Sequence, residues 1–351
     1  MKFITIDKKD WTKGIDNSRK TYQLFGPVKD EKNGCKITKL DTNVLPDMDY
    51  HESVLSAKSV LFPQTETILT TSLNESVEEH HVMKRAKNDY TPRAVLGIRP
   101  YDAKAIGLVK LNFDTKEYRD PYWCDAYEAT TFIGLGITRP GPFDFSTSVG
   151  CGPFCEEGLD ILLADLDDKY LAKVITPKGE AYAAACGFDT PADDKESQAL
   201  FDILRKEAEK NISTSVDTLN LKEKNLLDLH EAPFWDDVAF ACINCGTCTY
   251  VCPTCWCFDI QDEAKLKESA RFRNWDTCMS PLFTRHATGH NPRGAKVQRV
   301  RQRFMHKLKY FLDKYDQGIM CVGCGRCVKS CPVNIDIRQV AHTMNTYEKK
   351  D

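Results

Sequence analysis

The stretch Cys242-Ile243-Asn244-Cys245-Gly246-Thr247-Cys248-Thr249-Tyr250-Val251-Cys252-Pro253 holds four of the sixteen cysteines of this 351-residue chain. A second stretch, Cys321-Val322-Gly323-Cys324-Gly325-Arg326-Cys327-Val328-Lys329-Ser330-Cys331-Pro332, repeats the same spacing. In each stretch three cysteines stand three residues apart, a fourth follows after three further residues, and a proline comes next. The repetition indicates two equivalent metal-binding loops.

This spacing is the one that bacterial ferredoxins use to bind a cubane [4Fe–4S] cluster. Three thiolates from one short loop can occupy three corners of a cubane, and Gly246, Gly323 and Gly325 allow the backbone to wrap closely around it. In two-cluster ferredoxins the cysteine before the proline binds the other cluster. The predicted ligands are therefore Cys242, Cys245, Cys248 and Cys331 for the first cluster, and Cys321, Cys324, Cys327 and Cys252 for the second.

Zinc and disulfide bonds explain these cysteines less well. Structural zinc favours two separated pairs of cysteines, and disulfides require an oxidising compartment. Residues 1–8 lack the apolar core of a signal peptide, and charges interrupt every later apolar run before it could span a bilayer. With 42% hydrophobic residues and a net charge of −3, the chain has no global attraction to nucleic acid or membranes. We therefore expect a folded cytoplasmic protein with reduced thiols and no membrane insertion.

The first part of the chain, residues 1–235, has few cysteines and is predicted to be a mixed α/β domain. The predicted strands are 94–98, 131–137, 160–166 and 170–175, the last two joined by a turn at Asp167-Asp168, and the predicted helices are 102–111, 196–210 and 217–229.

The second part, residues 236–351, is predicted to be an α-helical ferredoxin-like domain with two [4Fe–4S] clusters. Sixty-eight residues separate Cys252 from Cys321, and much of this insert, including 297–314, has helical character. An insert of this length favours an arrangement in which helices surround the two clusters. The fold class expected for the whole chain is α+β.

The insert carries the motifs of a known family. These are Cys252-Pro-Thr-Cys255-Trp-Cys257-Phe-Asp259, Asn274-Trp-Asp-Thr-Cys278, Gly289-His-Asn-Pro-Arg293 and Arg301-Gln-Arg-Phe-Met-His-Lys307, with Gly97-Ile-Arg-Pro-Tyr-Asp-Ala103 and Asp120-Pro-Tyr-Trp123 upstream. Together they resemble the iron–sulfur β subunit of cytoplasmic sulfhydrogenases, its counterpart in anaerobic sulfite reductase, and the iron–sulfur subunit of flavin oxidoreductases that feed heterodisulfide reductase. The likeness is strongest from Cys242 to Ile337. Tyr101 and Thr138 stand where this family commonly has cysteines.

The resemblance implies an electron-transfer subunit of an anaerobic oxidoreductase complex. One partner would be an FAD- and NAD(P)-binding subunit, and the other a hydrogenase, heterodisulfide reductase or sulfite reductase subunit. The chain itself contains no dinucleotide, phosphate-binding or nucleophile-elbow motif, which is consistent with nucleotide and flavin sites on other chains.

Three further cysteines, Cys255, Cys257 and Cys278, suggest a third cluster, with Cys151 or Cys155 as its fourth ligand. The alternative is that they line the cluster cavity as small apolar side chains. The remaining cysteines, Cys35, Cys124 and Cys186, are isolated in sequence and are predicted to be structural.

The insert is also basic, with twelve Lys or Arg and two acidic residues between Lys265 and Lys309. Cations near anionic clusters would raise their potentials, and a basic face could dock an acidic partner. A solvated face is the simpler alternative, and the absence of a nucleic-acid motif disfavours nucleic-acid binding.

Two other functions stay open at the level of sequence. The chain could itself be a catalytic reductase, with a site near Cys151, Cys155 and Cys255. Alternatively, its clusters could be purely structural, as in some nucleic-acid enzymes. Reversible redox cycling separates a carrier from a structural role, and turnover by the isolated chain identifies a catalyst.

Overall fold

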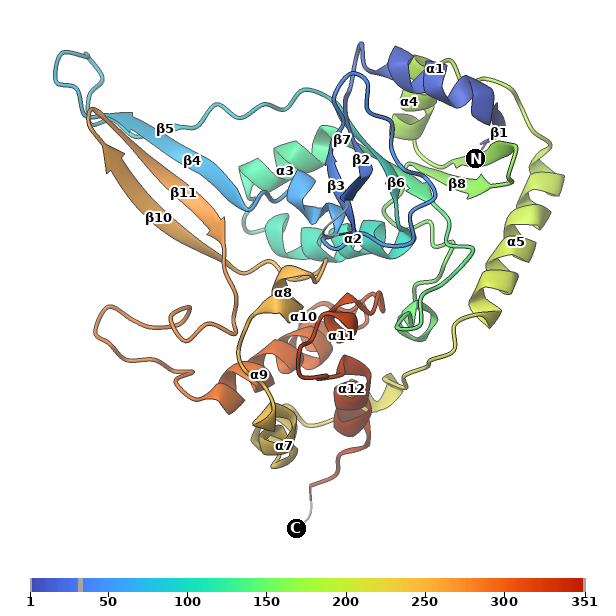
Figure 1. Ribbon diagram of the computed structural model, residues 1–351. Helices are drawn as coiled ribbons and strands as arrows, with labels where there is room; N and C mark the ends of the chain where they lie inside the picture. The colour runs from blue at the N-terminus through green and yellow to red at the C-terminus, as the bar shows by residue number, and fades with distance from the viewer. Residues whose placement is uncertain (1, 31–33, 350–351) are drawn as a thin grey trace.

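The computed structural model describes residues 2–30 and 34–349 and places a seven-stranded mixed sheet in the N-terminal part (Figure 1). The order of its strands is β1-β9-β8-β7-β6-β2-β3, and the neighbours β2, β6, β7 and β8 run parallel. The strands are β1 Lys2–Asp7, β2 Gln23–Asp30, β3 Gly34–Lys39, β6 Arg93–Ile98, β7 Thr130–Leu135, β8 Ile161–Asp165 and β9 Lys169–Val174.

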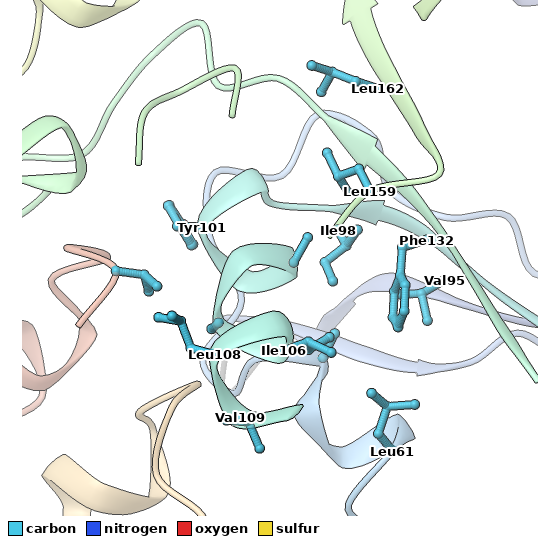
Figure 2. Close-up of a cluster of buried hydrophobic side chains, with 14 of the residues drawn as sticks. Leu61, Val95, Ile98, Tyr101, Ile106, Leu108, Val109, Phe132, Leu159 and Leu162 are labelled. Atoms are coloured by element: carbon cyan, nitrogen blue, oxygen red, sulfur yellow. The ribbon is translucent and has the colours of Figure 1, made fainter. Parts of the chain in front are cut away.

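Helices cover this sheet. In the N-terminal part they are α1 Lys8–Ser18, α2 Pro100–Phe113, α3 Pro121–Glu128, α4 Pro177–Cys186 and α5 Asp194–Lys210, with short 3₁₀ turns at Ala57–Val60 and Ser146–Val149. Strand β6 has five buried residues in a row because apolar side chains cover both of its faces. Figure 2 shows Val95, Ile98 and Phe132 of the sheet beside Ile106 of α2 and Leu61.

The sequence predicted four strands and two helices of this part correctly, all of them from residue 93 onward. The strands at 94–98 and 131–137 and the helix at 102–111 correspond to β6, β7 and α2. Strands β8 and β9 form the expected antiparallel hairpin, with Asp167 in the turn at a φ of 65°. The single helix predicted over 217–229 was wrong. It is a 3₁₀ turn, Leu219–Leu221, followed by α6, Leu226–Glu231, because the Asn225 side chain accepts hydrogen bonds from the N–H groups of Leu227 and Asp228 and begins a new helix.

A second sheet joins distant parts of the chain. Strands β4 Thr65–Ser72 and β5 Lys84–Arg85 pair with the hairpin β10 Phe258–Lys265 and β11 Glu268–Trp275 in the order β10-β11-β4-β5. This sheet extends away from the main body in Figure 1. The buried Arg273 of β11 binds Asp120 at 2.6 Å and Glu66 at 2.5 Å. The 68-residue insert therefore contains a β-hairpin in addition to its expected helices.

The remaining helices gather below α2 in Figure 1. They are α7 Phe234–Phe240, α8 Thr247–Tyr250, α9 Lys296–Met305, α10 Phe311–Tyr315, α11 Arg326–Lys329 and α12 Ile337–Thr346. A π-helical segment, His306–Tyr310, joins α9 to α10, so the helix predicted over 297–314 is confirmed as one continuous run with a local change of pitch. A separate apolar core that includes Trp235, Phe304 and Met344 holds these helices together.

The chain has the expected α+β fold, with the sheet in the N-terminal part. The boundary between residues 235 and 236 stays a prediction, because the second sheet takes strands from both sides of it. Within residues 2–30 and 34–349 no helix is long and apolar enough to cross a membrane.

Candidate metal centre

One pocket is lined by every cysteine of the first predicted set, namely Cys242, Cys245, Cys248 and Cys331. They come from the loop after α7, from α8 and from the turn after α11, so residues almost 90 positions apart meet here. The backbone N–H of Asn244 donates to Cys242 Sγ at 3.4 Å, and that of Ile335 donates to Cys331 Sγ at 3.2 Å. Such donors favour negative charge on cluster sulfurs, so this pocket fits a [4Fe–4S] cluster.

The second predicted set is Cys252, Cys321, Cys324 and Cys327. Burial raises the pKa of Cys321 to about 12, and the nearby sulfur of Cys252 contributes to the increase. After the larger effect of burial, Cys252 also raises the pKa of Cys324 and of Cys327. After the effect of burial, Cys327 of the second set likewise raises the pKa of Cys248 in the first set, so these effects show only that the two stretches come near one another. Cys252 as the crossing ligand of the second set stays a prediction.

Buried cations surround the second set. Lys58 Nζ donates to the backbone oxygen of Cys252 at 2.9 Å and to that of Cys255 at 3.0 Å. Lys307 Nζ donates to Thr254 Oγ1 at 2.5 Å, and this hydroxyl contacts Cys252 Sγ at 3.3 Å. Although burial acts to lower it, the pKa of Lys307 is raised by the sulfurs of Cys252 and Cys255. These contacts favour a negative charge at the second set.

A buried ion pair attaches the second set to the first sheet. Arg326, between Cys324 and Cys327, binds Asp102 through two hydrogen bonds of 2.6 and 2.8 Å, and each residue is only 2% exposed. The Nε of Arg326 also donates to the backbone oxygen of Ser53 at 2.8 Å. Asp102 lies in the first turn of α2. The sequence alone did not reveal this role, and the signal that could have found it was an acidic residue in an otherwise apolar helix start.

Two glycines of the second stretch serve a purpose that the sequence did not reveal. Gly323 and Gly325 both have positive φ, at 71° and 74°. A Cβ on Gly323 would lie 2.5 Å from the backbone nitrogen of Ser146, and one on Gly325 would overlap the carbonyl oxygen of Phe143. The N–H of Phe145 donates to the oxygen of Gly323 at 2.9 Å. These glycines therefore allow the cysteine loop to pack against the N-terminal part.

A separate pocket of about 360 Å³ is lined by the three additional cysteines Cys255, Cys257 and Cys278. We call it the Cys255 pocket. Its other polar lining residues are Thr254, Arg293, Gln302, Arg303, His306 and Lys307. Burial and the nearby cations lower the pKa of His306 to about 4, so its imidazole is neutral at physiological pH. The structure thus brings the three cysteines together around one cavity.

The two cysteines proposed as the fourth ligand lie elsewhere. Cys151 and Cys155 lie in one loop and shift each other's pKa, and among the described residues neither lines the Cys255 pocket. Their role as ligands or as a catalytic site stays a prediction. Cys35, Cys124 and Cys186 are all buried, at 8%, 2% and 2% exposure, as a structural role requires.

Five of the twelve basic residues of the insert are buried. Arg273, Arg299, Arg303, Lys307 and Lys309 are each at most 6% exposed. Arg303 lines both the first-set pocket and the Cys255 pocket, and its Nε has no hydrogen-bond partner among the described residues. Although burial acts to lower it, the pKa of Arg303 is raised by the sulfurs of Cys248 and Cys327. These five residues do not form a solvated face, because their side chains are buried.

Comparison with known proteins agrees with this geometry. Residues 241–335 match the family described as a 4Fe-4S dicluster domain. The chain is 25% identical over 348 residues to the sulfhydrogenase 2 subunit beta of Pyrococcus furiosus, and the match covers 96% of each chain. No solved structure matches significantly. The resemblance expected from the motifs is confirmed: the chain carries a 4Fe–4S dicluster domain and is similar along nearly its whole length to a sulfhydrogenase β subunit.

Proposed function

We propose that this chain is the electron-transfer subunit of a cytoplasmic anaerobic oxidoreductase complex. It would relay single electrons from or to a partner that binds FAD and NAD(P), with a hydrogenase, heterodisulfide reductase or sulfite reductase subunit at the other end of the relay. The observation that carries the proposal is the meeting of Cys242, Cys245 and Cys248 of the first stretch with Cys331 of the second at one pocket. The similarity to a sulfhydrogenase subunit supports a multi-subunit setting.

Some residues of the chain would bind the two clusters, and others would set their reduction potentials. Each set supplies four thiolates, and [4Fe–4S] clusters bound in this way accept and release single electrons. Around the second set, Lys58 and Lys307 place positive charge in the interior, which favours the reduced, more negative state. Around the first set, backbone N–H donors also favour the reduced state, but more weakly.

A partner chain would dock on the exposed surface beside the first set. Cys245 is exposed, and the apolar side chains of Phe240 and Ile243 beside it are 83% and 63% exposed. Exposed apolar groups next to a redox centre are expected where another chain docks. The nucleotide- and flavin-binding steps then occur on other subunits, because this sequence lacks their motifs.

Anaerobically prepared protein tests this function directly. We expect about eight irons or more per chain, reversible one-electron cycling with dithionite in a redox titration, and no NAD(P)H oxidation by the isolated chain. Clusters that fail to cycle would support a structural role instead. Dye reduction with NADH by this chain alone would show that it is a catalyst, and mass spectrometry of co-purifying chains would identify the partners.

A further inference from the structure

The Cys255 pocket has three thiols and no fourth among its described lining residues, because neither Cys151 nor Cys155 lines it. Among its lining residues, only four side chains can bind iron through a thiolate or a neutral nitrogen: Cys255, Cys257, Cys278 and His306. The others are apolar, cationic, hydroxyl or amide groups. His306 is therefore the one histidine or cysteine available to complete the set in the described lining of this cavity.

The position of His306 supports this role. It begins the π-helical segment between α9 and α10, and single π-turns in helices occur frequently at functional sites. Its ring packs edge-on against Trp256, with ring centres 5.9 Å apart, and Trp256 lies between Cys255 and Cys257 in the chain. No hydrogen bond from a described residue reaches its imidazole, and His306 lines the pocket.

The size and charge of the pocket indicate an iron–sulfur cluster instead of a single ion. A volume of about 360 Å³ equals on the order of ten water volumes, far more than one zinc ion needs. Within the described parts of the chain, no three Cys, His, Asp or Glu side chains already converge closely enough to hold one ion. Arg303 is 6% exposed with an unpartnered Nε, and Lys307 is 4% exposed, so buried positive charge is present to balance an anionic group.

We propose that Cys255, Cys257, Cys278 and His306 hold a third iron–sulfur cluster, with the imidazole of His306 as the fourth ligand. The inference rests on the proposed function, because it adds a further electron site to the same subunit. A neutral imidazole in place of a thiolate removes one negative charge, so this cluster has a higher potential than an all-cysteine equivalent, as histidine ligation does in Rieske centres. It would be the site of the chain that reduces most easily.

Iron content and magnetic resonance test the ligand set. Wild-type protein, prepared anaerobically, should contain about twelve irons per chain, because each of three cubanes holds four. His306→Ala should lose about four irons while the signals of the two main sets persist. His306→Cys should keep about twelve irons, and one cluster should shift to a lower potential. Pulsed EPR should detect a directly bonded nitrogen in wild type that disappears in His306→Cys, whereas the exposed control His342→Ala changes neither measurement.

The possible failures separate the two proposals. Fully loaded wild-type protein with eight irons, two reversible signals and no bonded nitrogen would overturn the third cluster and leave the carrier function standing. Retention of twelve irons and of the nitrogen coupling in His306→Ala would exclude His306 as the ligand. About one zinc per chain, released by Cys257→Ser, would show a zinc site. Absence of reversible cycling in every preparation would instead contradict the carrier function itself.

Discussion

The two cysteine stretches share one spacing, yet the structure gives them different surroundings. In the first stretch Cys245 is exposed, and Ile243 beside it is 63% exposed. Around the second, Arg326 is 2% exposed and Lys307 is 4% exposed. The first set therefore includes an exposed cysteine, whereas every cysteine of the second set is buried or partly buried and has buried cations nearby. Equal ligand spacing determines which cofactor binds, while the surroundings determine its potential and access.

A single pair of equivalent positions produces much of this difference. Thr247 in the first stretch corresponds to Arg326 in the second. Arg326 reaches Asp102 and Ser53 in the N-terminal part, whereas a threonine is too short to make a comparable contact. The second stretch is thus fixed to the sheet, and the first is held mainly by the helical core.

The largest expected effect comes from replacing either of the two predicted crossing ligands with serine. Cys252→Ser should remove or alter the cluster of the second set, and Cys331→Ser should do the same to the first set, each with a loss of up to about four irons. Signals are assigned with Cys245→Ser and Cys324→Ser, which lie at the uncrossed positions. EPR spectra in which Cys252→Ser disturbs the Cys245 signal alone would refute the crossing.

Removing the carboxylate of the buried ion pair should be the next largest effect. Asp102→Ala leaves Arg326 buried without its partner, so the free energy of unfolding should fall by about 3–5 kcal/mol. The double variant Asp102→Leu/Arg326→Met should recover most of this loss. Asp49→Ala, which breaks the exposed pair with Arg139, should have little effect in the same denaturant titration. If Asp102→Ala and Asp49→Ala lowered the free energy of unfolding equally, burial of the Asp102–Arg326 pair would be unimportant.

The potential of the second set should depend on one lysine. Lys307→Met removes a buried positive charge near Cys252, which disfavours the reduced state, so the potential should fall. A unit charge at about 7 Å in an effective dielectric of about 20 is worth roughly 2.4 kcal/mol, which corresponds to on the order of 100 mV for one electron.

Lys309→Met is the matched control for this measurement. Lys309 lies two residues away on the same π-helical segment and is buried, but its Nζ binds Asp313 at 2.9 Å and the backbone oxygens of Leu221 and Lys222. Its removal should leave both potentials nearly unchanged in a redox titration. Similar shifts in the two variants would argue against a local effect of Lys307.

The smallest effect should come from two matched glycines. Gly246 and Gly325 occupy equivalent positions with φ of 76° and 74°, so alanine costs each about 1–2 kcal/mol through backbone strain. Only at Gly325 would the added Cβ overlap a backbone atom, the oxygen of Phe143, whereas at Gly246 its nearest contact is the Thr277 side chain at 3.0 Å. Gly325→Ala should therefore be the less stable variant in thermal unfolding. The reverse order would contradict the close packing of the second stretch.

The sequence predicted local features well because their causes are local. Cysteine spacing is a property of a short loop, and the apolar run of β6 marks a buried strand wherever the chain folds. The β10–β11 hairpin escaped prediction because β10 is almost entirely exposed and half of its residues are charged, and because the hairpin pairs with β4, almost 200 residues earlier. The helix at 217–229 was misread because a cap at Asn225 outweighed the apolar period.

The sequence by itself indicated the iron–sulfur cofactor class, four strands of the first sheet and the helix over 297–314, because cysteine spacing and apolar period act over a few residues. Only the tertiary structure decided that Arg326 meets Asp102, that five basic residues of the insert are buried, and that His306 joins Cys255, Cys257 and Cys278 at one cavity. These relations join residues from about 30 to more than 200 positions apart. They depend on packing between distant segments, which no local pattern in the chain records.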